Sequence, residues 1–271
     1  MKKGIKLELY RAFYNPGFLL AILAGCIIAG AHFFHQVLPK TAMIFSGYNI
    51  DYPVNLFNSM LPLDYVSFYG SIYYYAVPLL AVLPSGVSYY QDLKSGYRKN
   101  LCIRMDKKAY LAGKYLAVFL SAGVVCVVPL LFNLMLTSAV LPALTPQKGT
   151  NLFAIIESSF LAELFYTKPF LYLLLYLLVD FVMTGTLACV ALGISAFVRN
   201  RYIVLFAPFL LFFLLQAVSE YTGYRGWNPY NIMNPVDSGV VTGMHVLMEA
   251  GAFLLIGGGS FILGGGRKDV L

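Results

Sequence analysis

Six long runs of apolar residues alternate with short polar segments along the chain. The runs cover residues 17–36, 68–90, 113–142, 169–198, 202–218 and 240–264. A helix needs about 20 predominantly apolar residues to cross the ~30 Å hydrocarbon core of a bilayer. The pattern therefore predicts an all-α, polytopic membrane protein with six transmembrane helices.

A shorter amphipathic segment, residues 4–15, precedes the first run. Its apolar residues recur at helical spacing on one face: Ile5, Leu9, Ala12 and Phe13. The other face carries Lys6 and Arg11, and Pro16 ends the pattern. A basic helix with one apolar face is typical of the membrane interface, so we predict an interfacial elbow helix. A solvated leader is the alternative.

The positive charges are distributed unevenly between the two sides that these six helices define. With the N-terminus in the cytoplasm, only four of the 19 Lys and Arg fall outside: Lys40, Lys148, Lys168 and Arg225. Cytoplasmic loops of membrane proteins carry an excess of Lys and Arg. We therefore expect both termini to be cytoplasmic. The compact outer loops favour a bacterial cell membrane.

The composition agrees with a chain that is almost entirely embedded in a membrane. Hydrophobic residues make up 59%, charged residues 11%, and the mean hydropathy is +0.74. Soluble domains carry about 25% charged residues. We expect one membrane domain over residues 1–271, with lipid around it. The pI near 9.1 follows from topology rather than from a nucleic-acid partner.

The start of the chain also has some features of a cleaved signal peptide. Lys2 and Lys3 are followed by an apolar run and by the small residues Ala29 and Ala31. Signal peptides, however, have short leaders and apolar cores of about 7–15 residues. The long leader and the long run favour an uncleaved anchor.

The cytosolic loop at residues 91–112 combines many basic residues with a regular apolar repeat. Leu93, Tyr97, Leu101 and Met105 recur every four positions. Such spacing predicts a short amphipathic helix that lies on the inner membrane face or docks into a partner. A basic anchor that serves topology alone is the other interpretation.

The order of these features resembles the ABC-2 type permease family, the membrane subunits of ATP-binding-cassette exporters. The likeness covers nearly the whole chain. It rests on the long polar break at 220–237 and on six residues around the first cytosolic loop: Asp92, Gly96, Arg104, Tyr110, Gly113 and Lys114. The motifs are loose, and no single stretch is diagnostic.

The resemblance implies how such a chain would work. Residues 91–110 would form a coupling helix that fits a cleft on a separate ATPase, and the 220–237 connection would form short re-entrant helices. The implied partners are two ATPase subunits and a second permease, identical or related. The coupling residues would be Asp92, Leu93, Gly96, Tyr97, Leu101, Arg104 and Met105.

The chain lacks the motif that would let it hydrolyse ATP. No G-x-x-x-x-G-K-[ST] sequence occurs, so nothing in it cradles ATP phosphates. The glycine triplets 257–259 and 264–266 fit close helix packing instead. We therefore expect no enzyme activity and no bound cofactor in this chain, with ATP and Mg held by the partner.

Two acidic residues lie deep inside predicted transmembrane helices. Asp180 and Glu249 have no Lys or Arg at their level. A charge at that depth costs at least ~2.5–3.5 kcal/mol, so each should face protein or water. They could line a translocation path for a cationic cargo, or serve as protonated hydrogen-bonding groups between helices.

Histidine and cysteine offer little chemistry. Zinc needs three or four convergent ligands, so we expect no metal site, and we expect His32, His35 and His245 to face the membrane interface. Cys26, Cys102, Cys126 and Cys189 show no metal or disulfide spacing and read as small packing residues.

Two other classes of function remain open at this point. Asp180 and Glu249 would suit a proton- or ion-coupled secondary transporter or channel. A non-transporting membrane protein, such as an immunity or sensor subunit, is the other alternative to an exporter permease. The sequence does not specify the cargo: peptide, drug, lipid and polysaccharide are all compatible with it.

Overall fold

A computed structural model describes residues 2–45, 54–104, 106–149, 153–198 and 200–267. About 80% of the chain is helical, and none of the described residues lies in a strand. The expectation of an all-α fold is confirmed.

The helices follow the predicted order. They are α1 (Lys2–Phe13), α2 (Pro16–His32), η1 (Phe33–Val37), α3 (Leu38–Phe45), α4 (Leu56–Ser59), α5 (Phe68–Val82), α6 (Ser88–Lys94), α7 (Tyr97–Arg104), α8 (Lys107–Val140), α9 (Ala162–Thr167), α10 (Pro169–Ser195), α11 (Arg201–Thr222), η2 (Arg225–Trp227), α12 (Pro229–Met233), η3 (Pro235–Val240) and α13 (Gly243–Arg267).

Five helical stretches are long and apolar enough to cross a membrane. They cover Pro16–Met43, Lys107–Val140, Pro169–Ser195, Arg201–Thr222 and Gly243–Gly264. The remaining apolar helix, α5, is only 15 residues long. At 1.5 Å per residue it extends about 22 Å, less than the ~30 Å of a hydrocarbon core. The sixth crossing therefore stays a prediction.

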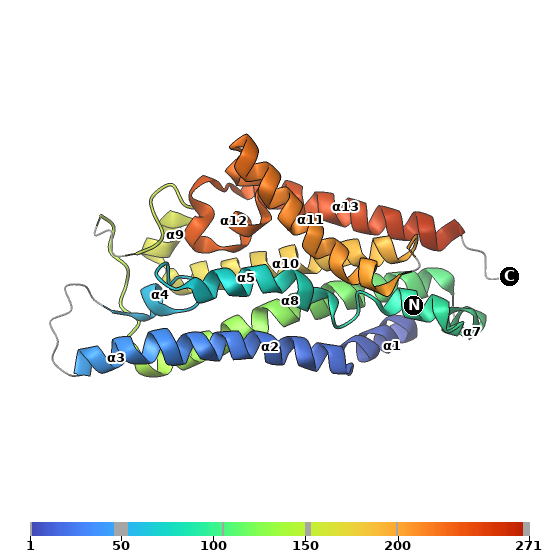
Figure 1. Ribbon diagram of the computed structural model, residues 1–271, viewed down its shortest axis with the longest axis horizontal. Helices are drawn as coiled ribbons and strands as arrows, with labels where there is room; N and C mark the ends of the chain where they lie inside the picture. The colour runs from blue at the N-terminus through green and yellow to red at the C-terminus, as the bar shows by residue number, and fades with distance from the viewer. Residues whose placement is uncertain (1, 46–53, 105, 150–152, 199, 268–271) are drawn as a thin grey trace.

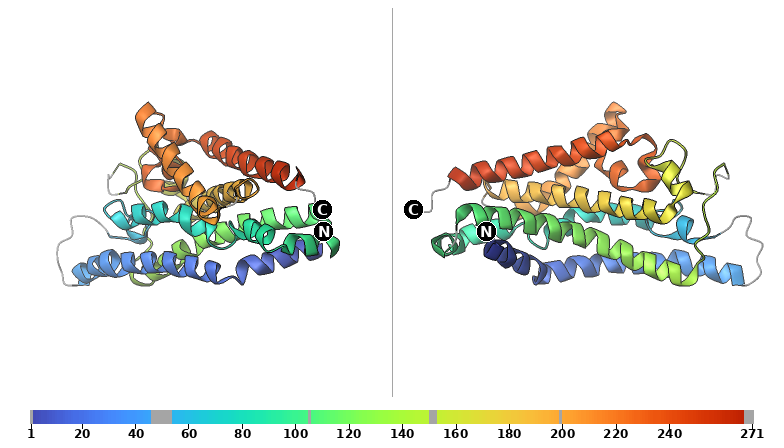
Figure 2. Two further views of the ribbon diagram at one scale, coloured as in Figure 1. Left: turned by 45° about the vertical axis from the view of Figure 1, so that its right-hand side comes forward. Right: turned by 180° about the vertical axis from the view of Figure 1, so that it is seen from behind.

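Helices α2, α5, α8 and α10 run along the long axis of the molecule, and α11 crosses them obliquely (Figure 1). Helix α10 packs against α5, α8, α11 and α13. One end of the bundle, here called the proximal end, holds α1, α6, α7 and the last turns of α13. The opposite, distal end holds α3, α4 and α9 (Figure 2).

Small residues bring α10 and α13 close together. A Cβ added to Gly257 would lie 2.7 Å from the backbone carbon of Cys189, and one added to Gly264 would lie 2.5 Å from Cβ of Ala196. Close approach at glycines is a common mode of packing in membrane helices. Gly257 and Gly264 thus have the packing role that the sequence predicts, whereas a Cβ on Gly259 would meet no atom within 4 Å.

The predicted run 68–90 is not one continuous helix. Helix α5 ends at Val82 and α6 begins at Ser88, with Pro84 between them. Proline cannot donate a backbone hydrogen bond. Leu83 before it keeps helical dihedral angles, with φ of −57° and ψ of −40°. The break moves Ser88 to Lys94 into a separate helix at the proximal end.

Part of the predicted outer loop 37–67 is buried rather than exposed. Residues 54–64 are all buried, and α4 packs against α8. Asn55 begins α4 by accepting hydrogen bonds from the backbone N–H groups of Phe57 and Asn58. Residues 54–64 thus extend from the start of α5 toward the distal end of the bundle, as turns and one short helix.

The connection between α11 and α13 also folds back into the protein. Its short helices η2, α12 and η3 bury Asn228, Ile232 and Ser238 completely. The Tyr176 hydroxyl of α10 donates a hydrogen bond to the Ile232 carbonyl at 3.1 Å. The short helices agree with the expected form of this connection, and their depth in a membrane stays a prediction.

Candidate functional site

Four charged side chains meet at the proximal end and form what we call the ion-pair cluster: Glu8, Arg11, Asp92 and Lys114. Lys114 Nζ lies 2.7 Å from Glu8 Oε2 and 2.6 Å from Asp92 Oδ2. Arg11 lies 3.0 Å from Glu8 Oε1 and 2.6 Å from Asp92 Oδ1. Two acids and two bases therefore compensate one another almost completely.

Three separate elements contribute these side chains. Glu8 and Arg11 come from α1, Asp92 from α6 and Lys114 from the second turn of α8. Glu8, Asp92 and Lys114 are each at most 2% exposed. Since an uncompensated buried charge is very unfavourable, the cluster holds α1 and α6 against the base of α8.

The buried face of α1 differs from the predicted one. Gly4, Glu8 and Ala12 are buried, whereas Ile5 and Leu9 are only partly covered. Helix α1 approaches α8 closely, because a Cβ on Gly113 would lie 3.1 Å from the Ile5 Cα. The buried face is thus centred on a carboxylate rather than on the apolar stripe. Whether α1 lies in a membrane interface is not tested.

Asp92 is the centre of the hydrogen bonding in the cluster. The Tyr110 hydroxyl donates to its Oδ2 at 2.7 Å, in addition to the bonds from Arg11 and Lys114. Burial alone would raise the pKa of the Asp92 carboxyl, but the hydrogen bond from Arg11 and the charge of Lys114 outweigh burial and lower that pKa. Asp92 is therefore ionised at neutral pH.

The predicted amphipathic helix at 91–110 is two helices, α6 and α7, with a break at Gly96. Gly96 has φ of +71°, a backbone conformation that glycine adopts without strain. The break turns Tyr97 back toward α1, where the Arg11 guanidinium lies 4.5 Å above the centre of its ring. The coupling residues therefore form a folded hairpin rather than one straight helix.

The other predicted coupling residues divide into two groups. Leu93 and Leu101 pack against a core cluster that contains Tyr89, Tyr110 and Phe261. The side chain of Arg104, and Met105 as a whole, lie outside the described residues. On the exposed side of α6 and α7 lie Lys94, Lys99, Asn100 and Ile103, and Ile103 is 82% exposed.

A cavity of about 310 Å³ opens beside the ion-pair cluster. It lies between α1, α6 and the base of α8, and Tyr10, Tyr14 and Gln91 line it together with Glu8 and Lys114.

Asp180 and Glu249 lie on neighbouring helices at nearly the same level. Gly257 of α13 packs beside Cys189 of α10, and Gly264 packs beside Ala196, so Glu249 lies near the level of residue 181. Both acids are at most 5% exposed. The Tyr74 hydroxyl donates to Asp180 at 3.3 Å, whereas the Glu249 oxygens have no hydrogen-bond partner among the described residues.

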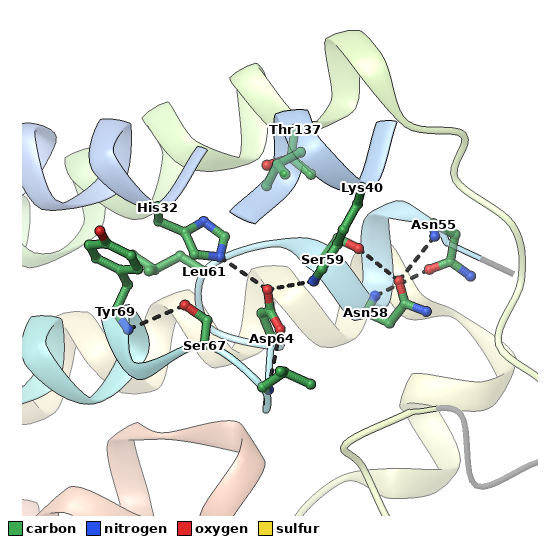
Figure 3. Close-up of polar contacts among 12 residues, drawn as sticks. His32, Lys40, Asn55, Asn58, Ser59, Leu61, Asp64, Ser67, Tyr69 and Thr137 are labelled. Carbon is green, nitrogen blue, oxygen red and sulfur yellow. Dashed lines mark hydrogen bonds and ion pairs between the residues drawn. The ribbon is translucent and has the colours of Figure 1, made fainter. Parts of the chain in front are cut away.

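A second polar cluster lies at the distal end (Figure 3). We call it the distal cluster: His32, Lys40, Asp64 and Asn133. Asp64 Oδ2 lies 3.3 Å from His32 Nε2 and 2.7 Å from Lys40 Nζ. The expectation that His32 faces the membrane interface is wrong, because its ring is completely buried.

Asn133 connects the distal cluster to the main chain of two other elements. Its Oδ1 accepts from the Leu61 N–H at 2.8 Å, and its Nδ2 donates to the Ala29 carbonyl at 3.0 Å. Nδ2 also lies 3.0 Å from His32 Nδ1. His35 contacts the Tyr69 hydroxyl instead and is exposed.

Of the four residues of the ion-pair cluster, sequence reasoning singled out Asp92 and Lys114, both through the family resemblance. It assigned Glu8, Arg11 and Asn133 no role. The spacing of Glu8 and Arg11, three residues apart on one helix, is typical of an ion pair and was an available signal. Asn133 stands alone within an apolar run, and a lone amide there needs a hydrogen-bonding partner.

Neither metal coordination nor a cysteine bridge is indicated among the described residues. No three His, Cys, Asp or Glu side chains gather there as metal ligands would. Cys26, Cys126 and Cys189 are free, and the last two are buried, in agreement with a packing role. Comparison of the chain with protein-family models, with curated proteins and with solved structures found no match.

Proposed function

We propose that this protein is the permease subunit of an ATP-driven exporter of the ABC-2 type. In this proposal the α6–α7 hairpin binds a separate ATPase, and the bundle forms the translocation path with a second permease copy. The chain would bind no ATP itself. The proximal end would face the cytoplasm, as the distribution of Lys and Arg favours.

The observation that carries the proposal is the ion-pair cluster that joins the hairpin to the bundle. A docking element transmits motion only if it is firmly held to the helices that must move. Asp92 of α6 is bound at 2.6 Å both by Arg11 of α1 and by Lys114 of α8. A push on the hairpin would therefore reach α1 and α8 directly.

The outer surface of the hairpin supports a protein partner. Ile103 is 82% exposed and lies on α7 with Lys99 and Asn100, both exposed. An apolar side chain surrounded by basic and polar groups suits a cleft with an acidic rim. Leu93 and Leu101, which pack inward, would stiffen the hairpin instead.

The carboxyls of Asp180 and Glu249 keep the choice of cargo open. Their similar level on α10 and α13 is compatible with a path for a cationic cargo. It is equally compatible with the rival function, a proton- or ion-coupled transporter. The bond from Tyr74 to Asp180 supports a hydrogen-bonding role between helices for that residue.

The experiment that tests the proposal first asks whether a gene next to that of this chain encodes an ABC ATPase, and then uses that ATPase. The two proteins, reconstituted together in lipid vesicles, should co-purify, and ATP hydrolysis should be faster than for the ATPase alone. Replacing Ile103→Asp should abolish most of the stimulation and leave the permease folded.

The matched control is Leu144→Asp, an exposed apolar residue in the chain that follows α8 at the distal end. It should retain stimulation. Equal activity of Ile103→Asp and wild type would contradict docking at α7. Absence of co-purification for the wild type would contradict the exporter proposal as a whole.

A further inference from the structure

The distal cluster determines which nitrogen of His32 carries a proton. Asn133 Oδ1 accepts from the Leu61 N–H, and Asn133 Nδ2 donates to the Ala29 carbonyl. Neither backbone group can exchange its role, so the orientation of the amide is defined. The atom of Asn133 that faces His32 Nδ1, at 3.0 Å, is therefore the donor Nδ2.

His32 Nδ1 must accept this hydrogen bond and cannot carry a proton while the bond exists. The ring is then neutral, with its proton on Nε2, where it is donated to Asp64 at 3.3 Å. The neutral ring thus completes a continuous chain of bonds from α8 through α2 to the segment before α5.

Protonation of the ring would place two donors against each other. The charged imidazole carries N–H groups at both nitrogens, and Nδ1–H would point at Asn133 Nδ2. Turning the Asn133 amide over does not relieve the contact without loss, because it breaks the bonds to Leu61 and Ala29. The Asp64 side of the ring, by contrast, favours the charged form.

We propose that His32 is a proton-operated latch: the neutral ring holds residues 60–64 against α8, and protonation releases them from Asn133 while Asp64 keeps hold of the ring. The Leu61 N–H loses its acceptor when Asn133 turns. The segment then stays attached to α2 and α3 and separates from α8.

The groups around His32 define when the latch responds. Asp64 comes from the α4–α5 segment, and Lys40 from α3 offsets its charge at 2.7 Å. From α8 come only the neutral Asn133 and Thr137, and from α5 comes Tyr69, whose ring centre lies 6.1 Å from that of His32 and which also contacts His35. Lys40 is 17% exposed, whereas Asp64 and His32 are buried.

The backbone beside His32 is suited to such a change. The π-helical turn η1 begins at Phe33, directly after His32, and joins α2 to α3. Single π-helical turns occur often at functional sites, because one extra residue per turn can be shifted along the helix.

The first measurement is the protonation of the three histidines by ¹⁵N NMR, with the labelled chain in lipid nanodiscs and with His35→Asn and His245→Asn variants for assignment. At about pH 8 the His32 ring should be neutral with its proton on Nε2, because Nδ1 accepts from Asn133, and the ring is then followed as the pH is lowered. A proton on Nδ1, or a charged ring at the higher pH, would overturn the proposal.

The second measurement is hydrogen–deuterium exchange of peptides from residues 54–67, corrected for the intrinsic effect of pH. Loss of the Asn133 bond should make exchange about tenfold faster at the lower pH, which corresponds to about one net hydrogen bond. Unchanged exchange while His32 becomes charged would also overturn the proposal. His245→Gln is the control, and it should behave as the wild type.

The decisive variant is Asn133→Asp. A carboxylate can accept from the Leu61 N–H and from a charged His32 at the same time. His32 should then be charged at about pH 8, and exchange at 54–67 should no longer rise at the lower pH. A neutral His32 in this variant would contradict the role given to Asn133. If the variant does not fold, the two wild-type measurements decide alone.

Discussion

The two polar clusters occupy opposite ends of the same helices and are built from different chemistry. The ion-pair cluster, from here on also called the proximal cluster, consists only of charged groups. Lys114 lies between two carboxylates, and side chains join α1 to α6. The distal cluster contains one carboxylate, one ammonium group, an imidazole and an amide, and Asn133 binds main-chain atoms. The first joins helices to one another, and the second satisfies a segment that is not helical.

This difference follows from what each end must stabilise. Helices satisfy their own backbone, so α1 and α6 need only side-chain contacts to stay in place. Residues 60–64 form turns rather than a helix and lie buried among apolar helices. The N–H groups of Leu63 and Asp64 bond to the Met60 carbonyl, whereas the Leu61 N–H bonds to the Asn133 side chain. An unpaired backbone N–H there would be costly, and the Asn133 amide removes that cost. Removing one member should therefore have different consequences at the two ends.

The largest effect on folding is expected for Lys114→Met. The substitution keeps the length of the side chain and leaves Glu8 and Asp92 with one cation in place of two. Breaking a buried ion pair from one side destabilises proteins by about 3–5 kcal/mol. Thermal unfolding in detergent, followed by a thiol-reactive dye that reports exposure of Cys126 and Cys189, should show a large fall in Tm.

Lys108→Met, an exposed lysine in the first turn of the same helix, is the control. Equal Tm values for the two variants would mean that the proximal cluster adds nothing to stability.

A smaller loss is expected for Asn133→Leu at the distal end. The Ala29 carbonyl still accepts from the Phe33 N–H, but the Leu61 N–H and the Thr137 hydroxyl lose their acceptor, and His32 Nδ1 loses its donor. An orphaned buried donor costs about 1–3 kcal/mol. The same assay should place this variant between wild type and Lys114→Met. Asn100→Leu, an exposed asparagine on α7, should be close to wild type.

Acid should separate the two clusters. The pKa of Asp92 is lowered, because hydrogen bonding from Arg11 and the charge of Lys114 outweigh the effect of burial. A carboxyl with a lowered pKa stabilises the fold above its unfolded value, ~3.9, and this stabilisation is lost as pH falls through the lower folded value. Asp92→Asn should therefore lower Tm above about pH 5, where the charged carboxylate stabilises the wild type, and flatten the fall of Tm below about pH 4.

His32 adds a response at higher pH to the distal end alone, since no histidine belongs to the proximal cluster. The distal carboxylate Asp64 also has a lowered pKa, with burial opposed by the hydrogen bond from His32 and the charge of Lys40. Asp64→Asn should change the Tm profile below about pH 4 and also at the higher pH at which protonation of His32 releases the latch. A change confined to the lower range would count against His32 as the second group.

The smallest effect on stability is expected for Asp180→Asn and Glu249→Gln. Neither acid has a cationic partner in the described structure, so neutral amides should change stability by less than about 1 kcal/mol. If the two acids line the path of a cationic cargo, export by vesicles that contain the double variant should fall while ATPase binding is kept. Export equal to wild type would contradict a place in the cargo path and favour hydrogen bonding between helices as the role of both acids.

Much of the helical framework could be predicted from the sequence because apolar periodicity is local. The start of α10 agrees with the predicted boundary, and α11 begins one residue before the predicted 202. A helix was expected at 4–15, and α1 covers Lys2–Phe13, while its place in a membrane interface stays a prediction. Breaks were harder to place: the run 68–90 is apolar throughout, and only the structure shows that Pro84 divides it.

The candidate site was predictable only in part. Asp92, Gly96 and Lys114 entered through the resemblance, and Asp92 and Lys114 lie at the centre of the proximal cluster. Glu8 was missed because amphipathic reasoning assigns the buried face to apolar residues such as Ile5 and Leu9. A carboxylate can be buried when two cations neutralise it, and periodicity carries no information about such partners.

By itself the sequence determined that this chain is helical, apolar enough for a membrane and rich in Lys and Arg at one set of loops. Those properties depend on neighbouring residues and on composition. Only the tertiary structure decided which polar groups meet: Glu8 with Lys114, and His32 with Asp64 and Asn133. These partners lie far apart in the chain, and a buried charge or amide selects its partner by position in space after the helices have packed.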